Sequence, residues 1–192
     1  MILSDRTIKS LLKEKKLFIK ALSPQAIQPS SIDLTLDSDA LILKHWNTKG
    51  VLDLNSKVEY QKIISKNEII IPAHSFVLAT TKEFIELPSD VSGFVEGRSS
   101  IGRMGLFIQN ASVVGPGFKG KLTLELYNAN ILPISLKPGR RICQLILFQM
   151  DQPAERSYKG KYQGQNKTTP TKAFLDNESK KKDLKRKVKK RV

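Results

Sequence analysis

Hydrophobic and polar residues alternate with a period of two along several short segments of this chain. Alternation of this kind predicts β-strands that have one face in a hydrophobic core. The segments that show it best are 32-IDLTL-36, 68-EIII-71, 76-FVLAT-80, 122-LTLELYN-128 and 141-RICQLILF-148. Near the N-terminus the spacing changes to that of an amphipathic helix, which we predict over residues 4–15 with Ser4 as its N-cap.

Turn-forming sequences separate the predicted strands. Proline, glycine, serine and aspartate favour turns, and they gather in 28-QPSS-31, 87-LPSD-90, 115-GPG-117 and 137-KPG-139. Many short strands with regular turns predict a mainly β fold, as a sandwich, a jelly roll or a small barrel. A chain of 192 residues has the length of one domain, or of one domain followed by a tail.

Positive charge is concentrated at the C-terminus. The net charge of the chain is +15, and residues 178–192 hold nine Lys or Arg and two acids, which is +7. The basic body that precedes them favours an anionic ligand. We expect the tail to be disordered or loosely helical, and to serve as a solubilising segment, a nucleic-acid-binding segment or a sorting signal.

The composition predicts a soluble, cytoplasmic protein. Its single cysteine, Cys143, excludes an intramolecular disulfide and fits a reducing compartment. The N-terminus is charged almost from its start, and no apolar run approaches the length of about 18 residues that crosses a membrane. We therefore expect neither a signal peptide nor a membrane partner.

The segment 96-EGRSSIGRMG-105 has the composition of an anion-binding loop. Its glycines permit a close approach of the backbone to an anion, and Arg98 and Arg103 can each form a fork onto phosphate oxygens. Ser99 and Ser100 add hydroxyl donors. The segment is not a Walker A loop, so a phosphate site competes with a simpler interpretation as a turn that carries solvated arginines.

Glu125 is an acidic residue in the middle of a predicted strand, where glutamate is uncommon. Taken alone, it would be a surface residue on a solvated strand face. The stiff turn 115–121 that precedes the strand, and Tyr127 on the same face, favour a second interpretation. A carboxyl group with restricted access to solvent has a raised pKa and can transfer a proton near neutral pH.

The chain lacks the ligands of a zinc-dependent nucleobase deaminase, which needs a His or Cys and a CxxC pair. Cys143 lies in an apolar strand that predicts core packing, and His45 and His74 stand apart in the sequence. No GxSxG nucleophile elbow is present either. If the chain is an enzyme, we expect a carboxylate as its acid and base, and an anionic substrate.

Five segments together resemble dCTP deaminases, which belong to the superfamily of trimeric dUTPases and dCTP deaminases. They are 30-SSIDLTL-36, 96-EGRSSIGRMGL-106, 116-PGFKGKLTLELYN-128, 138-PGRRICQL-145 and 161-KYQGQ-165. The resemblance runs from Met1 to about Asp176, so we predict one domain over 1–176 and a separate tail over 177–192. It implies a distorted β-barrel of the jelly-roll or β-clip type, a homotrimer with active sites between subunits, and Mg²⁺ carried by the substrate triphosphate, without zinc.

The resemblance also implies roles for individual residues. Glu125 takes the place of the glutamate that deprotonates the attacking water and passes the proton to the ring nitrogen and then to departing ammonia. Ser99 and Arg103 belong to a motif that binds phosphate and positions the water. The implied nucleotide contacts are Arg98, Ser99, Ser100, Ile101, Gly102, Arg103, Gly115, Thr123, Leu124, Glu125, Gln144, Tyr158, Lys161 and Gln165.

Some of these contacts have a further implied character. Thr123 and Leu124 lie where backbone groups read the base. Tyr158, Lys161 and Gln165 lie in the polar segment 157–170, which the resemblance makes a flap that closes over bound nucleotide. The implied ligands are dCTP and dUTP, with dTTP as a possible feedback ligand.

The chain departs from the family pattern beside the Pro-Gly turn. The pattern has Gly or His after the alanine at position 111, and an aspartate before Pro116, where this chain has Ser112 and Gly115. In the family that aspartate contacts the deoxyribose 3′-hydroxyl, and in diphosphatase members it helps to hold the water that attacks phosphorus. Its absence predicts weak or absent dUTP cleavage.

The predicted function is therefore zinc-independent deamination of dCTP to dUTP and ammonia. The alternative is a bifunctional enzyme that forms dUMP and pyrophosphate, because 104-MGLFIQNA-111 and Gln144 resemble the dUMP-forming members more closely. Further alternatives are a dUTPase, which Glu125 and the missing aspartate disfavour, and a non-catalytic protein that binds nucleotides, or nucleic acid through the tail.

Overall fold

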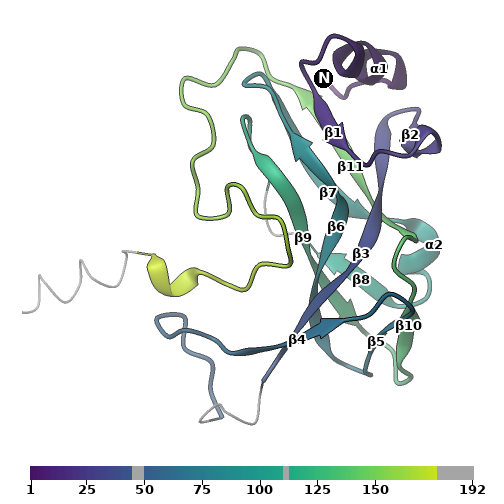
Figure 1. The fold of residues 1–192 in the computed structure, drawn as a ribbon, viewed down its shortest axis with the longest axis vertical. Coiled ribbons are helices and arrows are strands. Elements are labelled where there is room, and N and C mark those ends of the chain that lie inside the picture. The colour runs from purple at the N-terminus through teal and green to yellow at the C-terminus, as the bar shows by residue number, and fades with distance from the viewer. Residues whose placement is uncertain (45–49, 110–112, 177–192) are drawn as a thin grey trace, which may run out of the picture.

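The structure is a computed structural model that describes residues 1–44, 50–109 and 113–176 (Figure 1). Its helices are α1 (Asp5–Lys13) and α2 (Ser99–Gly102), with 3₁₀ turns η1 (Pro24–Ala26) and η3 (Ala173–Leu175). Its strands are β1 (Phe18–Lys20), β2 (Ile27–Gln28), β3 (Ser31–Leu43), β4 (Tyr60–Ile64), β5 (Ile69–Ile71), β6 (Phe76–Glu86), β7 (Val91–Gly97), β8 (Leu106–Gln109), β9 (Lys119–Asn128), β10 (Ile134–Leu136) and β11 (Arg141–Gln149). The alternating segments of the sequence fall on these strands, as predicted, and Glu68 alone lies just outside its strand.

Antiparallel pairing joins most of the described strands into one curled sheet. Its order is β7-β11-β3-β6-β9-β8, with β1 attached to β6 and with β2 and β4 attached to β3, while β5 and β10 form a separate ribbon. The two end strands of this order, β7 and β8, contact each other, and Gly93 of β7 forms a bridge with Val114. The sheet is therefore almost closed, which confirms the predicted distorted β-barrel (Figure 1).

Alternation along the central strands sends every second side chain into the interior of the barrel. The buried aliphatic residues of β3 and β9 are Ile32, Leu34, Leu36, Leu122, Leu124 and Leu126, none more than 5 % exposed. Burial of one such side chain contributes roughly 1.5–3 kcal/mol, so these two strands supply much of the core. Cys143 on β11 is also fully buried, as predicted, and burial raises the pKa of its thiol.

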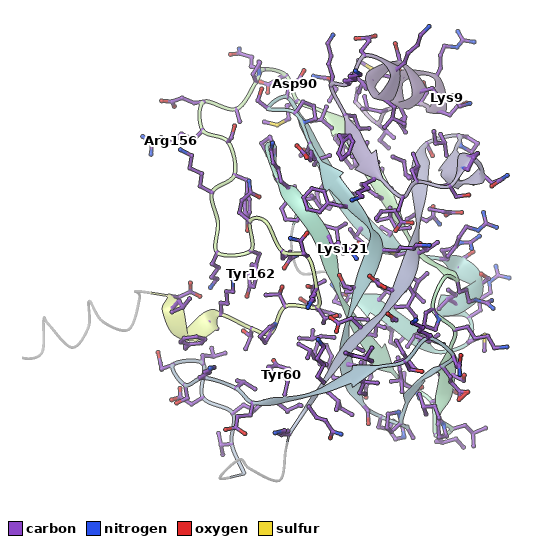
Figure 2. All side chains as sticks on the ribbon, viewed as in Figure 1. Lys9, Tyr60, Asp90, Lys121, Arg156 and Tyr162 are labelled. Atoms are coloured by element: carbon purple, nitrogen blue, oxygen red, sulfur yellow. The ribbon has the colours of Figure 1, made fainter. Side chains whose placement is uncertain are left out.

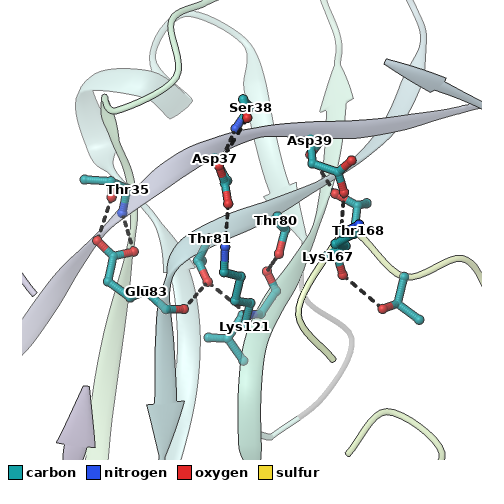
Figure 3. Close-up of polar contacts among 12 residues, drawn as sticks. Thr35, Asp37, Ser38, Asp39, Thr80, Thr81, Glu83, Lys121, Lys167 and Thr168 are labelled. Carbon is teal, nitrogen blue, oxygen red and sulfur yellow. Dashed lines mark hydrogen bonds and ion pairs between the residues drawn. The ribbon is translucent and has the colours of Figure 1, made fainter. Parts of the chain in front are cut away.

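The opposite face of β3 carries a row of polar residues that contact neighbouring strands. Thr35 donates a hydrogen bond from its hydroxyl to Glu83 at 2.6 Å, and Asp37 accepts one from Lys121 Nζ at 2.6 Å (Figure 3). Burial raises the pKa of the Glu83 carboxyl group. The row follows the alternation of the strand and consists of Ser31, Asp33, Thr35 and Asp37.

Helix α1 begins where predicted and ends two residues early. Ser4 caps it by accepting a hydrogen bond from the Thr7 amide, and Ile8 is fully buried against the barrel. After Lys13 the chain cannot continue the helix, because Lys15 has a positive φ of 56°. Within the described residues, every helix is too short or too polar to cross a bilayer.

Candidate active site

An open pocket of about 970 Å³ lies between the outer face of β9 and the C-terminal segment 158–176. Its walls come from β6, β9, the turn at 113–118 and the C-terminal segment, which runs beside β9 in Figure 1. The structure therefore gathers the glutamate predicted to be catalytic and the residues of the predicted flap. The predicted site residues that line the pocket are Gly115, Thr123, Glu125, Tyr158, Lys161 and Gln165.

Glu125 faces this pocket from the middle of β9. Its neighbours Leu124 and Leu126 are fully buried in the core, so the alternation of the strand turns Glu125 outward. The strand is paired on both sides here, because Glu125 is opposite Leu78 of β6 and Gln109 of β8. Partial burial raises the pKa of the carboxyl group through desolvation. Glu125 is thus a firmly held carboxyl group that keeps a proton more readily than a solvated glutamate does.

The C-terminal segment pairs with the edge of β9 beyond the end of β8. Strand β8 pairs with β9 up to Gln109. Nearer the start of β9, the Lys121 amide donates to the Gln165 carbonyl at 2.8 Å, and the Gln165 side-chain amide donates to the Lys121 carbonyl at 2.8 Å. Lys121 marks this position in Figure 2. The predicted flap, residues 157–170, is therefore seated against the strand that carries Glu125.

The ring of Tyr158 packs against Gly115, at the position where the family pattern has aspartate. A Cβ atom added to Gly115 would lie 3.4 Å from Cδ2 of this ring. The ring is also tilted against that of Phe118, with their centroids 5.8 Å apart. Any side chain at position 115 would therefore share its space with Tyr158. Ser112, the other departure from the pattern, lies outside the described residues.

Lys161 lines the pocket and forms an ion pair that the sequence did not indicate. Its ammonium group donates to both carboxylate oxygens of Asp176 at 2.6 Å, and this contact raises the pKa of Lys161. The ring centroid of Tyr162, labelled in Figure 2, lies 5.5 Å from the ammonium nitrogen of Lys172. Asp176 and Tyr162 both line the pocket. The sequence marks these two residues only weakly as parts of the site. Tyr162 is next to the predicted contact Lys161, and Asp176 is the residue at which the family resemblance ends.

The arginine- and serine-rich segment lies elsewhere, just before β8. Its central residues, Ser99–Gly102, form the single turn of α2 with Arg98 at the N-cap position, so the predicted loop is a short helix. Ile101 is buried in the core, which leaves only its backbone for a ligand. No residue from 98 to 103 lines the pocket.

Two further predicted contacts lie outside the pocket. Gln144 on β11 accepts a hydrogen bond from the Ser31 hydroxyl at 3.0 Å, and the buried side chain of Leu124 leaves only its backbone for a ligand. Apart from Leu124, the predicted residues therefore form two groups within one chain. The pocket group is Gly115, Thr123, Glu125, Tyr158, Lys161 and Gln165, and the α2 group is Arg98, Ser99, Ser100, Ile101, Gly102, Arg103 and Gln144.

The histidines do not join either group among the described residues. His74 is exposed in a turn and has a positive φ of 51°, whereas His45 lies outside the described residues. Across 1–44, 50–109 and 113–176, no three His, Cys, Asp or Glu side chains form a group that could hold a metal ion.

The dCTP deaminase-like family matches residues 2–150 of this sequence. This chain belongs to the dCTP deaminase-like family. The family assignment confirms the resemblance seen in the sequence, and it covers the barrel strands and both Glu125 and α2. Residues beyond 150, which include the predicted flap, lie outside the match.

Two relatives of this chain align with it over almost their whole length. A protein of Persephonella marina named "dCTP deaminase, dUMP-forming" is 48 % identical over 180 residues, which is 92 % of this chain and 99 % of the relative. A protein of Aquifex aeolicus with the same name is 45 % identical, over 94 % and 99 % of the two chains. The solved 2′-deoxycytidine 5′-triphosphate deaminase from Agrobacterium tumefaciens shares the fold, with a TM-score of 0.60 at 23 % identity, over 76 % of this chain and 47 % of that chain.

Proposed function

We propose that this chain hydrolytically deaminates dCTP at C4 of cytosine. The observation that carries the proposal is Glu125, a carboxyl group with a raised pKa that faces the pocket from a paired strand. Membership of the dCTP deaminase-like family supports it, and so do the names of the relatives from Persephonella marina and Aquifex aeolicus.

In this proposal, Glu125 carries every proton that the reaction moves. Its carboxylate takes a proton from water as the oxygen attacks C4, which makes C4 tetrahedral, and gives that proton to the ring nitrogen N3. It then moves the remaining proton of the new hydroxyl group to the amino group, which leaves as ammonia while the C4 carbonyl forms. One water is consumed, one ammonia is released, and Glu125 ends ionised as it began. A pKa raised toward neutrality suits a group that must both accept and donate.

The pocket group would bind the nucleoside around this carboxylate. Backbone groups of Thr123 and Leu124, which precede Glu125 in β9, would read the base, and a strand holds them more firmly than a loop would. Tyr158 and Gln165 lie across the pocket on the C-terminal segment. Binding energy from these contacts would hold C4 near the water and lower the barrier to attack.

The α2 group would bind the triphosphate, with Mg²⁺ as part of the substrate. Arg98 and Arg103 supply positive charge and Ser99 and Ser100 supply hydroxyl donors, which are the groups that recognise phosphate. Ser99 and Arg103 would also position the attacking water. We expect no zinc requirement, so a zinc-selective chelator should leave ammonia release unchanged while Mg²⁺ is kept in excess.

Because the two groups do not meet within one chain, we propose that active sites form between copies in a homotrimer. An exposed aromatic row beside Glu125 supports this assembly. Phe76, Tyr127 and Phe107 lie opposite one another on β6, β9 and β8, and they are 45 %, 38 % and 55 % exposed. Exposed apolar patches of this kind mark surfaces that another protein covers.

A mixing experiment tests both the chemistry and the shared site. Glu125→Gln and Arg98→Gln should each abolish most ammonia release from dCTP. When equal amounts are mixed, unfolded and refolded together, about a quarter of the sites should pair an intact Glu125 with an intact Arg98 from the other copy. Activity should return toward that fraction. Failure to regain activity, with trimers present by light scattering, would contradict shared sites, whereas an inactive wild type would contradict deamination itself.

For the product, we propose dUMP and pyrophosphate, because the relatives at 48 % and 45 % identity are named dUMP-forming. This is the alternative of the sequence prediction rather than its first choice. Release of dUTP is the second candidate, favoured by Gly115, which supplies no carboxylate beside Tyr158.

Chromatography of the nucleotides formed from dCTP and Mg²⁺ separates the two products. Formation of dUMP at the rate of ammonia release supports the proposal, while accumulation of dUTP overturns it and leaves deamination intact. In the second case, Gly115→Asp should begin to convert dUTP to dUMP if the missing carboxylate is the cause. Gly115→Asn is the matched control, because it has the same size and no charge.

A further inference from the structure

A buried carboxylate lies between two arginines beside α2. Asp33 is on the polar face of β3, and its side chain is 3 % exposed. Its Oδ2 accepts a hydrogen bond from Arg141 Nη1 at 2.9 Å, and its Oδ1 lies 3.6 Å from Arg98 Nε. Gln144 is directly opposite Asp33 in the pairing of β3 with β11. One predicted nucleotide contact, Arg98, therefore lies beside Asp33, a second, Gln144, is its partner in the sheet, and Arg141 is a further residue at the same place.

The pairing orients the arginines as well as neutralising the carboxylate. A buried carboxylate is stable only with close cationic partners, so Asp33 restricts where both guanidinium groups can lie. Asp33 is nearest to Arg98 through Nε, which leaves the two terminal nitrogens of Arg98 as the fork that can face a ligand. The side chains of Arg98 and Arg141 are 27 % and 45 % exposed. Two positive charges thus face solvent across one buried negative charge.

We propose that Arg141 is a further phosphate-binding residue, and that Asp33 is the positioning residue that holds Arg141 beside Arg98. The inference rests on the proposed function, because the ligand is the substrate triphosphate bound by the α2 group. A triphosphate spreads its negative charge over several oxygens, and two adjacent guanidinium groups can contact more of them than one can. Arg141 would contact the phosphates directly, whereas Asp33 would act only through the arginines.

The chain supplies a matched control in the preceding residue, Arg140. It is exposed, and it carries the same charge at the position just before β11 begins. Among the described residues, Arg140 makes no ion pair with Asp33, whose partners are Arg98 and Arg141. An effect of general positive charge would be the same for both arginines, but a contact that depends on Asp33 would appear only at Arg141.

The first experiment compares steady-state kinetics of Arg141→Gln and Arg140→Gln. Loss of one charge-assisted contact should raise the KM for dCTP in Arg141→Gln by roughly 10-fold with little change in kcat. Arg140→Gln should stay within about twofold of the wild type in both parameters. Equal effects of the two substitutions, or no effect of Arg141→Gln, would overturn the role of Arg141.

The second experiment tests positioning with a double-mutant cycle of Asp33→Asn and Arg141→Gln. If Asp33 holds Arg141 in place, Asp33→Asn should raise the KM for dCTP by roughly 10-fold or more, and the further increase should be clearly smaller when Arg141 is already glutamine. Additive losses would indicate a purely structural role and overturn the positioning role. If Asp33→Asn does not fold, Asp33→Glu replaces it, and restored folding with a raised KM supports positioning, whereas wild-type kinetics contradict it.

Binding of inorganic tripolyphosphate separates failure of this inference from failure of the proposed function. Calorimetry on the wild type, Arg141→Gln and Arg140→Gln needs no turnover. Weaker binding confined to Arg141→Gln supports the phosphate contact even if dCTP proves not to be the substrate. Equal affinity of all three proteins contradicts the contact even if the wild type deaminates dCTP.

Discussion

The two ends of the candidate site differ in how the fold treats charge. In the pocket, the carboxyl group of Glu125 is desolvated, and burial is the one cause that raises its pKa. At the α2 end, the carboxylate of Asp33 is more deeply buried but is matched by Arg141 at 2.9 Å and by Arg98 at 3.6 Å. Both carboxylates sit on paired strands of the same sheet.

Each electrostatic arrangement suits a different task. A proton carrier must exist in both protonation states, so it works best where no cation fixes its charge. A phosphate site needs permanent positive charge held in a set geometry, and a buried counter-charge provides that geometry. The fold therefore uses desolvation in the pocket and ion pairing at the α2 end.

The largest expected effect comes from Glu125→Gln, which removes the proton carrier and keeps its shape. We expect kcat for ammonia release from dCTP to fall by roughly 10²–10⁴-fold, with the Kd for dCTP within a few-fold of the wild-type value. Glu68→Gln, at an exposed position outside the pocket, should leave both unchanged. Turnover near the wild-type rate in Glu125→Gln would remove Glu125 from its assigned role.

A smaller effect is expected at the ion pair that holds Lys161. Asp176→Asn removes the carboxylate that contacts the Lys161 ammonium at 2.6 Å, so the ammonium no longer has to leave an anionic partner before it contacts the nucleotide. Exposed pairs are weak, and the KM for dCTP should fall by about two- to fivefold, with kcat unchanged. Asp151→Asn, exposed and outside the pocket, is the control, and an increase in KM for Asp176→Asn would show that the pair supports binding instead.

The raised pKa of Glu125 predicts a modest change in stability with pH. Because the folded protein holds this proton more tightly than the unfolded chain does, wild-type stability is reduced above the folded-state pKa and is regained as the pH falls through it. Glu125→Gln carries no charge at any pH, so its Tm should exceed that of the wild type at neutral pH. The difference should shrink as the pH falls toward the ordinary glutamate pKa. A Tm difference that stays constant with pH would contradict the desolvation of Glu125.

The smallest effect is expected from deletion of residues 178–192. The last pocket-lining residue is Asp176, and the last residue of the α2 group is Gln144. We therefore expect kcat and KM for dCTP to stay within about twofold of the full-length values, even though the deletion removes a charge of +7. A loss of deamination would place the tail in the site. Steeply salt-dependent DNA binding that disappears with the deletion would give the tail a separate function.

Much of the fold was predictable because the decisive signals are local. Alternation over 122–128 places Leu122, Leu124 and Leu126 in the core and turns Glu125 outward, and this holds whatever strand lies beside β9. Ser4 predicts the start of α1 through the hydrogen bond that a cap must make. Closure of the barrel could not be predicted from local patterns, because it depends on which strands pair. The family resemblance supplied the prediction of a barrel.

The site itself was predictable residue by residue but not as an arrangement. Local patterns were enough to make Glu125 an outward carboxyl group on a strand, and to show that arginines, serines and glycines gather in 97–103. The shared pocket of Glu125 and the C-terminal segment, and the meeting of Asp33, Arg98 and Arg141, follow from the tertiary structure alone. Those contacts join residues far apart in the chain, and they form when the whole core closes and fixes the pairing of β3, β7 and β11. Side-chain period sets the face of a strand, whereas packing of the complete barrel sets its neighbours.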